Sequence, residues 1–316
     1  MEIIDDLSSV NPDGDTILTV GAFDGVHRGH RHLIQQMVEE ARQAKRLAGL
    51  ITFYPDPGAV LSPYNPTRYL STPGEKAALL ERLGLDILAI LPFDQGMAQT
   101  SARDFIDLVR RHLHMVELWV GEDFALGRAR QGNVTALRAM EQELGFTVRV
   151  IEPLTWQGQI ISSTRIRSLL LQGKVRKAAQ LLGRYPSLAG EVVRGSQRGH
   201  CLGFPTANLE VRKERIIPAD GTYAVYARLG KERHQGVANV GVRPSFEIGS
   251  ERIVEVHILD FEREIYGCDL VVEFVERLRD ERRFADVEEL KAQIERDIAR
   301  TRRIGAEEKS IPRTEA

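Results

Sequence analysis

The chain has 316 residues, which is long for one hydrophobic core, so its length predicts two domains. Its formal net charge of −2 at pH 7, with Lys and Arg spread along the sequence, argues against a dedicated nucleic-acid surface, and no apolar run is long enough to cross a membrane. The acidic N-terminus is unlike a secretory signal, and two cysteines without metal-ligand spacing argue against a disulfide framework. We therefore expect a cytoplasmic protein; the sequence is compatible with a monomer and with a homo-oligomer.

Apolar strand-like runs alternate with helical patterns through the first half of the sequence. Strands are predicted at residues 16–20, 50–53, 87–91, 116–120 and 148–151. Helices are predicted from about residue 30 and at 74–83, 102–113, 133–144 and 174–182. This alternation predicts an α/β domain with a doubly wound, Rossmann-like parallel sheet, whose ligands bind at the carboxyl ends of the strands.

The segment after the first strand, GAFDGVHRGH at residues 21–30, has the features of a phosphate-binding turn. Gly21, Gly25 and Gly29 let the backbone approach a ligand closely, and the helix that follows directs free amide groups and its positive dipole end at an anion. His27 and His30 add two side-chain donors. Zinc binding by this pair is the weaker interpretation, because no cysteine or third ligand lies nearby in the sequence.

A second candidate phosphate segment, ISSTRIR at residues 161–167, lies far along the chain. Its hydroxyl and guanidinium groups open another helical pattern, as expected of a turn that binds a triphosphate tail. The residues concerned are Ser163, Thr164, Arg165 and Arg167. The two segments together predict a nucleotide site.

The second half of the sequence has shorter β-rich runs with polar breaks. The runs lie at residues 191–193, 222–229, 235–240, 253–259 and 269–275, and this spacing favours a small antiparallel barrel. A terminal helix begins after Asp286, with Glu289 three residues on as in a capping box. We expect a first domain at residues 1–183, a second at 184–304 and a polar, flexible tail at 305–316.

The second half contains neither a Walker sequence nor the protein-kinase motifs, so a phosphoryl-transfer site there would need another scaffold. In GFPTANL, Thr206 and Asn208 are two residues apart, which puts their oxygens on one face of an extended segment. Gly195 and Arg198 lie in a flexible basic loop suited to phosphates. Alternation in the segment IVEVHIL also directs Glu255 to one face of a strand.

These motifs resemble a known enzyme family. GAFDGVHRGH with the STRIR turn is similar to the nucleotidyltransferase superfamily, and the full first string looks like its bacterial bifunctional riboflavin kinase and FMN adenylyltransferase branch, also called FAD synthetase. Three later segments, GEVVRGSQRGHCLGFPTANL, GVANVGVRPSF and VEVHILDF, are similar to riboflavin kinase motifs in the family's order. The resemblance extends from about residue 20 to residue 298.

The resemblance implies that riboflavin and ATP give FMN, and that FMN and a second ATP give FAD and pyrophosphate. It implies Mg²⁺ as cofactor and catalytic roles for His27, His30, Arg165 and Glu255, with the glutamate as general base. It implies ATP or phosphate contacts for Gly21, Phe23, Asp24, Gly25, Gly29, Asp123, Ser163, Thr164, Arg167, Gly195, Arg198, Gly203 and Pro205. Flavin contacts are implied for Phe53, Pro55, Pro57, Asn239 and Arg243, and magnesium contacts for Thr206 and Asn208.

Two alternatives stay open at this point. The first is an enzyme with kinase activity alone, whose N-terminal domain is inactive or specific for another substrate. The second is a flavin-binding regulator without catalysis, although such a module would not need Glu255. For Asp24, a role in holding the turn through backbone N–H groups is as compatible with the sequence as a ligand role.

Overall fold

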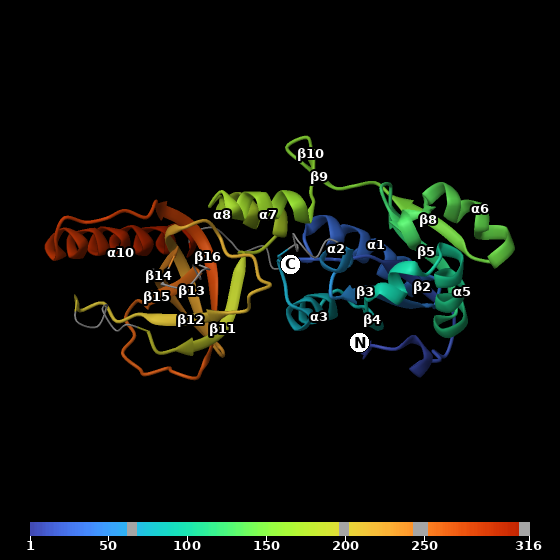
Figure 1. Cartoon of the computed structure of the whole chain (residues 1–316), viewed down its shortest axis with the longest axis horizontal. Helices are drawn as coiled ribbons and strands as arrows, with labels where there is room; N and C mark the ends of the chain where they lie inside the picture. Colours follow the sequence, from blue (N-terminus) through green and yellow to red (C-terminus); the bar gives the residue numbers. More distant parts are fainter. Residues whose placement is uncertain (62–67, 196–201, 243–251, 310–316) are drawn as a thin grey trace. The chain divides into compact units, whose positions relative to one another are not determined.

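The computed structural model describes residues 1–61, 68–195, 202–242 and 252–309 (Figure 1). Two of the residues singled out by the sequence, Arg198 and Arg243, lie outside these ranges. The chain divides into two compact units, Met1–Ser163 and Thr164–Ala316, and each is described by itself below.

The first unit is built on a six-stranded sheet in the order β1-β4-β3-β2-β5-β8, in which every neighbouring pair is parallel. The strands are β1 (Glu2–Ile4), β2 (Thr16–Val20), β3 (Leu47–Tyr54), β4 (Ile87–Pro92), β5 (Met115–Gly121) and β8 (Thr147–Ile151). From the central β2 the chain builds outward through β3 and β4, and it then returns to the other side of β2 to form β5. The loops after β2 and β5 therefore leave the sheet at its topological switch point, where such folds bind ligands.

Helices cover both faces of this sheet. They are α1 (Arg28–Gln43), α3 (Pro73–Glu81), α5 (Ala102–Leu113) and α6 (Val134–Leu144). Adjacent residues of β2 belong to different cores, because Ile17 packs with α1 and α3 whereas Leu18 packs with α5 and α6. On α1, Ile34 and Met37 are fully buried, and each such side chain contributes about 1.5–3 kcal/mol. The predicted doubly wound sheet is confirmed.

Several short elements of the first unit lie between the predicted ones. They are η1 (Leu7–Ser9), α2 (Pro57–Leu61), α4 (Gln95–Gln99), η2 (Arg128–Arg130) and the hairpins β6 (Ala125–Leu126) with β7 (Gly132–Asn133) and β9 (Thr155–Trp156) with β10 (Gln159–Ile160). Asn133, predicted as the first helical residue, instead caps α6 by accepting a hydrogen bond from the Ala136 amide at 2.9 Å.

The second unit is a closed antiparallel barrel with the strand order β11-β12-β15-β14-β13-β16, and β16 pairs back to β11. Its elements are α7 (Ser163–Leu171), α8 (Val175–Leu182), β11 (Ser187–Val193), β12 (Ala207–Val211), β13 (Gly221–Leu229), β14 (Glu232–Val242), β15 (Arg252–Ile258), β16 (Asp269–Arg279) and α10 (Val287–Lys309). Figure 1 shows α10 lying along the outside of the barrel, where it contacts β13 and β14. The predicted barrel and terminal helix are confirmed.

The helix α10 has the predicted start but a later end. The Glu289 amide donates to the Asp286 carboxylate at 2.8 Å, and the Glu289 carboxylate accepts from the Ala285 amide. The helix then continues to Lys309, so residues 305–309 are helical and do not belong to a loose tail. The reason is packing: Ile304 and Gly305 are buried, and a Cβ on Gly305 would collide with Gln235 of β14.

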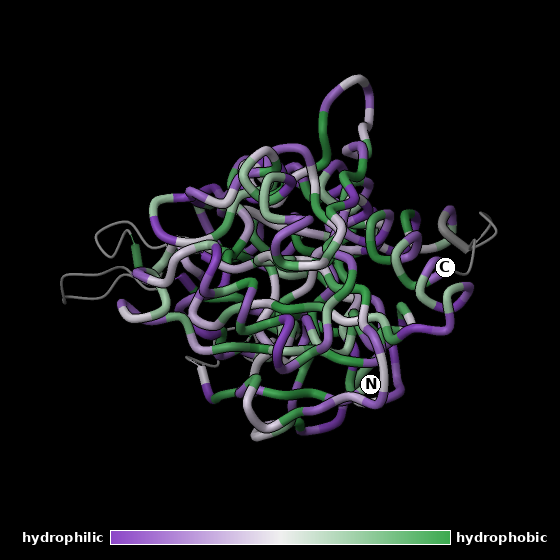
Figure 2. The backbone as a smooth tube through the Cα atoms, turned by 90° about the vertical axis from the view of Figure 1, so that its right-hand side faces the viewer, coloured by the Kyte–Doolittle hydropathy of each residue, from purple (hydrophilic) through white to green (hydrophobic). Residues whose placement is uncertain are grey.

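Along the described residues, hydrophobic and hydrophilic stretches of backbone alternate (Figure 2). Accordingly, within the residues that the structure describes, none of the helices is both long enough and apolar enough to span a membrane.

Candidate functional site

The turn from β2 to α1 in the first unit has an unusual backbone. Gly25 has φ +79°, and two non-glycine residues, Phe23 and Val26, also have positive φ, at +46° and +37°. The helix α1 begins at Arg28, two residues before the predicted start, because His27 acts as its N-cap. The Nδ1 atom of His27 accepts a hydrogen bond from the His30 amide at 3.2 Å. The tight turn thus places His27 at the N-terminus of α1.

The two histidines of the motif stack on each other, with ring centroids 3.5 Å apart and ring planes 19° apart. Because Nδ1 of His27 accepts a backbone N–H, the neutral ring carries its proton on Nε2. A Cβ on Gly29 would lie 3.2 Å from the His27 ring, so the glycine leaves room for that ring. The helix N-terminus and the two imidazoles together form a candidate anion-binding site.

Asp24 is 2% exposed, and its carboxylate accepts hydrogen bonds from the amides of Leu70 and Ser71. The Ser71 hydroxyl in turn accepts from the Gly25 amide at 3.0 Å. These contacts favour the interpretation of Asp24 as a residue that holds the turn. The other predicted segment joins here as well, because the Ser163 hydroxyl donates to the Asp24 carbonyl at 2.8 Å across 139 residues of sequence.

A buried lysine, which the sequence analysis missed, also contacts the turn. Lys76 is 8% exposed, and its Nζ donates to the Ala22 carbonyl at 2.6 Å and to the Thr52 hydroxyl at 3.0 Å. Burial lowers the pKa of Lys76, and the charges of Asp24 and Asp56 oppose that shift. The only local signal in the sequence was the capping box of Thr72 and Glu75, which marks the start of α3 and says nothing about a site.

Of the predicted flavin contacts, Phe53 lines a small cavity at the end of β3. The other residues around this cavity are Asp24, Tyr54, Asp56, Tyr69, Ser71, Pro73 and Lys76. Pro55 follows Tyr54 through a cis peptide bond and Pro57 begins α2, so both flank the cavity in sequence without lining it. The cavity adjoins the glycine turn, since Asp24 belongs to both.

The remaining predicted residues of the nucleotide site lie in two places. Asp123 is exposed in the loop after β5, where its carbonyl accepts a hydrogen bond from Arg130. Thr164, Arg165 and Arg167 lie near the start of α7, which belongs to the second unit from Thr164 onward; the threonine is exposed and both arginines are half-buried.

In the barrel, the predicted polar residues lie in one row across neighbouring strands. Asn208 of β12 is directly opposite Glu255 of β15, which is directly opposite Asn239 of β14. Opposed residues point to the same side of a sheet, and the neighbours Val254 and Val256 point to the barrel interior. The row therefore lies on the outer face. It continues to Thr222 of β13, whose hydroxyl is 3.5 Å from the Asn239 amide oxygen.

Gly195 and Pro205, on either side of residues 196–201, both contact side chains near this row. A Cβ on Gly195 would lie 2.1 Å from the Asn208 amide nitrogen, so any larger residue at that position would displace the Asn208 side chain. Gly203 has φ +87° and open space around it. The Pro205 carbonyl accepts a hydrogen bond from Nδ1 of His257 at 2.8 Å, and Thr206, half-buried, immediately precedes β12.

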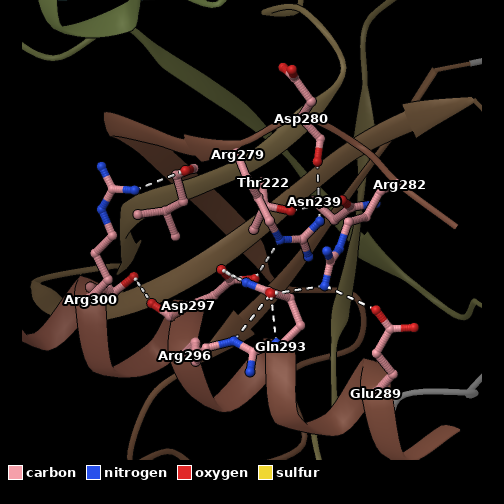
Figure 3. Close-up of polar contacts among 12 residues, drawn as sticks. Thr222, Asn239, Arg279, Asp280, Arg282, Glu289, Gln293, Arg296, Asp297 and Arg300 are labelled. Atoms are coloured by element: carbon pink, nitrogen blue, oxygen red, sulfur yellow. Dashed lines mark hydrogen bonds and ion pairs between the residues drawn. The ribbon is translucent and has the colours of Figure 1, made fainter. Parts of the chain in front are cut away.

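At the Thr222 end of the row, an ion pair joins α10 to the neighbouring strand β16 (Figure 3). Arg279 is opposite Thr222 in the pairing of β16 with β13, and its Nε donates to the Asp297 carboxylate at 2.9 Å. The other oxygen of that carboxylate accepts from the Gln293 amide at 2.9 Å, and the Asp297 side chain is 6% exposed. Helix α10 is thereby joined to the strand next to the polar row.

Comparison with known proteins identifies both units. A model of FAD synthetase matches residues 10–165, and a model of riboflavin kinase matches residues 182–305. The chain is therefore a two-domain transferase of flavin nucleotide synthesis.

Close relatives match almost the whole chain. A bifunctional riboflavin kinase/FMN adenylyltransferase from Escherichia coli (strain K12) is 38% identical over 90% of this chain and 91% of the relative, and one from Listeria monocytogenes is 36% identical over 92% of each. A crystal structure named as a macrolide-efflux protein from Streptococcus pneumoniae matches with a TM-score of 0.88 and 31% identity, over 95% of this chain and 98% of that one. The chain belongs to the bifunctional riboflavin kinase/FMN adenylyltransferase family. The presence of both domains supports the bifunctional interpretation over either alternative.

Proposed function

We propose that this chain phosphorylates riboflavin to FMN at the barrel and adenylylates FMN to FAD in the α/β unit. The observation that carries the proposal is that both family domains are present on one chain. The proposed catalytic domains are residues 1–183 and 184–304. We also propose a cytosolic location, because both reactions consume ATP.

For adenylyl transfer, a phosphate oxygen of FMN attacks the α-phosphorus of ATP while the bond from that phosphorus to the β-phosphate bridging oxygen breaks. Negative charge grows on the α-phosphate oxygens, and Nε2–H of His27 together with His30 donates hydrogen bonds to them. Amide groups at the start of α1 add to this stabilisation. Ser163, Thr164 and Arg165 hold the leaving pyrophosphate, with Arg167 beside them.

For flavin phosphorylation, the terminal ribityl hydroxyl attacks the γ-phosphorus of ATP and ADP leaves. Glu255 accepts the proton of that hydroxyl as general base. Its place in the row is the structural support for this role, since Asn208 and Asn239 flank it on the two neighbouring strands. Asn239 orients the flavin, and Gly195 lets the phosphate-binding loop approach Asn208.

We propose Mg²⁺ as the metal of the kinase site. In the described ranges no three His, Cys, Asp or Glu side chains gather in a group that could hold a metal ion. The Thr206 hydroxyl and the Asn208 amide oxygen are hard oxygen ligands, which suit Mg²⁺ when substrate phosphates complete the coordination. Bound there, the ion neutralises charge on the phosphates of ATP.

A chromatographic time course tests the two assignments. Wild-type protein with riboflavin, ATP and Mg²⁺ is expected to form FMN first and FAD later. His30→Ala is expected to stop at FMN, with FAD formation about 10²–10³-fold slower. Glu255→Gln is expected to form FMN from riboflavin about 10²–10⁴-fold more slowly, yet to convert added FMN to FAD at the wild-type rate.

Two substitutions serve as matched controls. His32→Ala removes a histidine of α1 that bonds only locally to Gln36, and Glu210→Gln removes an exposed carboxylate of β12. Both are expected to keep both activities. A wild-type protein that stops at FMN would show that the FMN assignment of the first domain is wrong, and a Glu255→Gln protein with full kinase activity would remove the general-base role.

A further inference from the structure

Lys76 of α3 is a buried charge that the proposed chemistry does not use. Removing an ammonium group from water is costly unless it is fully paired, and an apolar side chain of similar size usually serves a packing role better. Here the ammonium donates to two acceptors, the Ala22 carbonyl and the Thr52 hydroxyl, at 2.6 and 3.0 Å. The buried position of Lys76 therefore indicates a role that requires its charge and its hydrogen-bond donors.

The carbonyl that Lys76 binds belongs to the turn that carries the histidines. The Thr52 hydroxyl donates to the same Ala22 oxygen at 3.0 Å, so two donors converge on it. The residue after it, Phe23, has φ +46°, and Val26 has φ +37°. Such backbone conformations persist only where the surrounding contacts enforce them.

The rest of the turn is tied to the same stretch of chain. Leu70 and Ser71 hold the Asp24 carboxylate through their amides, and Ser71 accepts from Gly25. These residues directly precede α3, which carries Lys76. Both halves of the turn are thus held by residues 70–76, the first by the Lys76 ammonium and the second by Leu70 and Ser71.

We propose that Lys76 is a positioning residue for adenylyl transfer: by fixing the Ala22 carbonyl it sets the backbone of the turn and hence the placement of His27 and His30. The proposal rests on the proposed role of these histidines. Lys76 acts before the reaction, on the geometry of the donors, and it does not contact the reacting atoms.

The test compares Lys76→Met with Lys76→Arg and with Leu80→Ala. Leu80 lies one turn further along α3 and is fully buried, so its replacement destabilises the unit without removing a hydrogen bond to the turn. Lys76→Met is expected to lower kcat for FAD formation from FMN by about 100-fold, the effect of a displacement of about 1 Å, with KM for FMN and ATP changed less than about threefold. Lys76→Arg, which keeps the charge and donors, is expected to recover part of kcat.

Folding of the first unit can be followed separately, because both tryptophans of the chain, Trp119 and Trp156, lie in it. Rates are compared per folded molecule from the tryptophan fluorescence melt, and Lys76→Gln replaces Lys76→Met if that variant is unfolded at the assay temperature. A kcat unchanged from wild type, a loss no larger than in Leu80→Ala, or a rise in KM at constant kcat would each overturn the proposal. Failure of the proposed function can be told apart from failure of this proposal, because in the first case wild-type protein would make no FAD from FMN.

Discussion

Gly195 lies close to the side chain of Asn208 in the polar row of the barrel. A Cβ there would lie 2.1 Å from the Asn208 amide nitrogen, so in Gly195→Ala the amide must move by about 1 Å. We predict a loss of about 100-fold in riboflavin phosphorylation with FAD formation from added FMN unchanged. Steady-state assays of the two half-reactions measure this.

The control for that substitution is Gly230→Ala in the β13–β14 hairpin. Gly230 has φ +58° with no atom near its Cβ position, so alanine there adds backbone strain without moving Asn208. It is expected to keep the kinase activity. Equal losses in the two variants would mean that Gly195→Ala acts through stability and not through Asn208.

At the residue scale, the sequence indicated the residues proposed to do the chemistry better than the residues that hold them in place. His27 and His30 could be found because glycines at fixed spacing surround them, and the structure brings their rings together. Lys76 could not be found, because a single lysine in a helix is usually solvated and only the fold shows that this one is buried. The row of Asn208, Glu255 and Asn239 was equally hidden, since strand register depends on turns that the sequence does not specify.

At the element scale, α10 is held to the barrel by a nearly buried ion pair. Asp297 is 6% exposed and Arg279 is 20% exposed, so Asp297→Asn leaves a guanidinium with little water and no counter-charge. We predict a loss of about 3 kcal/mol in the unfolding free energy of the second unit, the low end for a broken buried pair. Urea unfolding followed by circular dichroism measures it, with tryptophan fluorescence showing the first unit unchanged.

Asp260→Asn is the matched control for this substitution. Asp260 also pairs with an arginine of α10, Arg302, but both side chains are more than half exposed. Solvent screens such a pair, so little change in unfolding is expected. A similar loss in both variants would contradict the assignment of α10 attachment to Asp297.

Prediction of helices and strands succeeded where the segment was long enough to show a hydrophobic periodicity. The strand Thr16–Val20 and the helix Ala102–Leu113 have the predicted bounds, because each presents a complete buried face. Two-residue strands such as β6 and β9 have no period to detect. The terminal helix ran past its predicted end because contacts with β14, which lies about 70 residues earlier in the sequence, favour helix at Ile304 and Gly305.

At the scale of the whole molecule, each unit has its own core, and the residues substituted to test the two reactions lie in different units. The kinase row lies on barrel strands of the second unit, and the histidine turn lies on the parallel sheet of the first. Substitutions in one site should therefore leave the other activity intact, which makes each activity an internal control for the other.

The most direct measurement mixes the two single-site variants. His30→Ala and Glu255→Gln are incubated together with riboflavin, ATP and Mg²⁺, and the flavins are separated over time. We predict that each variant alone forms FAD from riboflavin at least about 100-fold more slowly than wild-type protein, and that the mixture forms FAD at a rate close to wild type, after FMN has appeared. FAD formed by either variant alone at the rate of the mixture, or FMN that accumulates in the mixture without a matching rise in FAD, would contradict the assignment of the two reactions to these two sites.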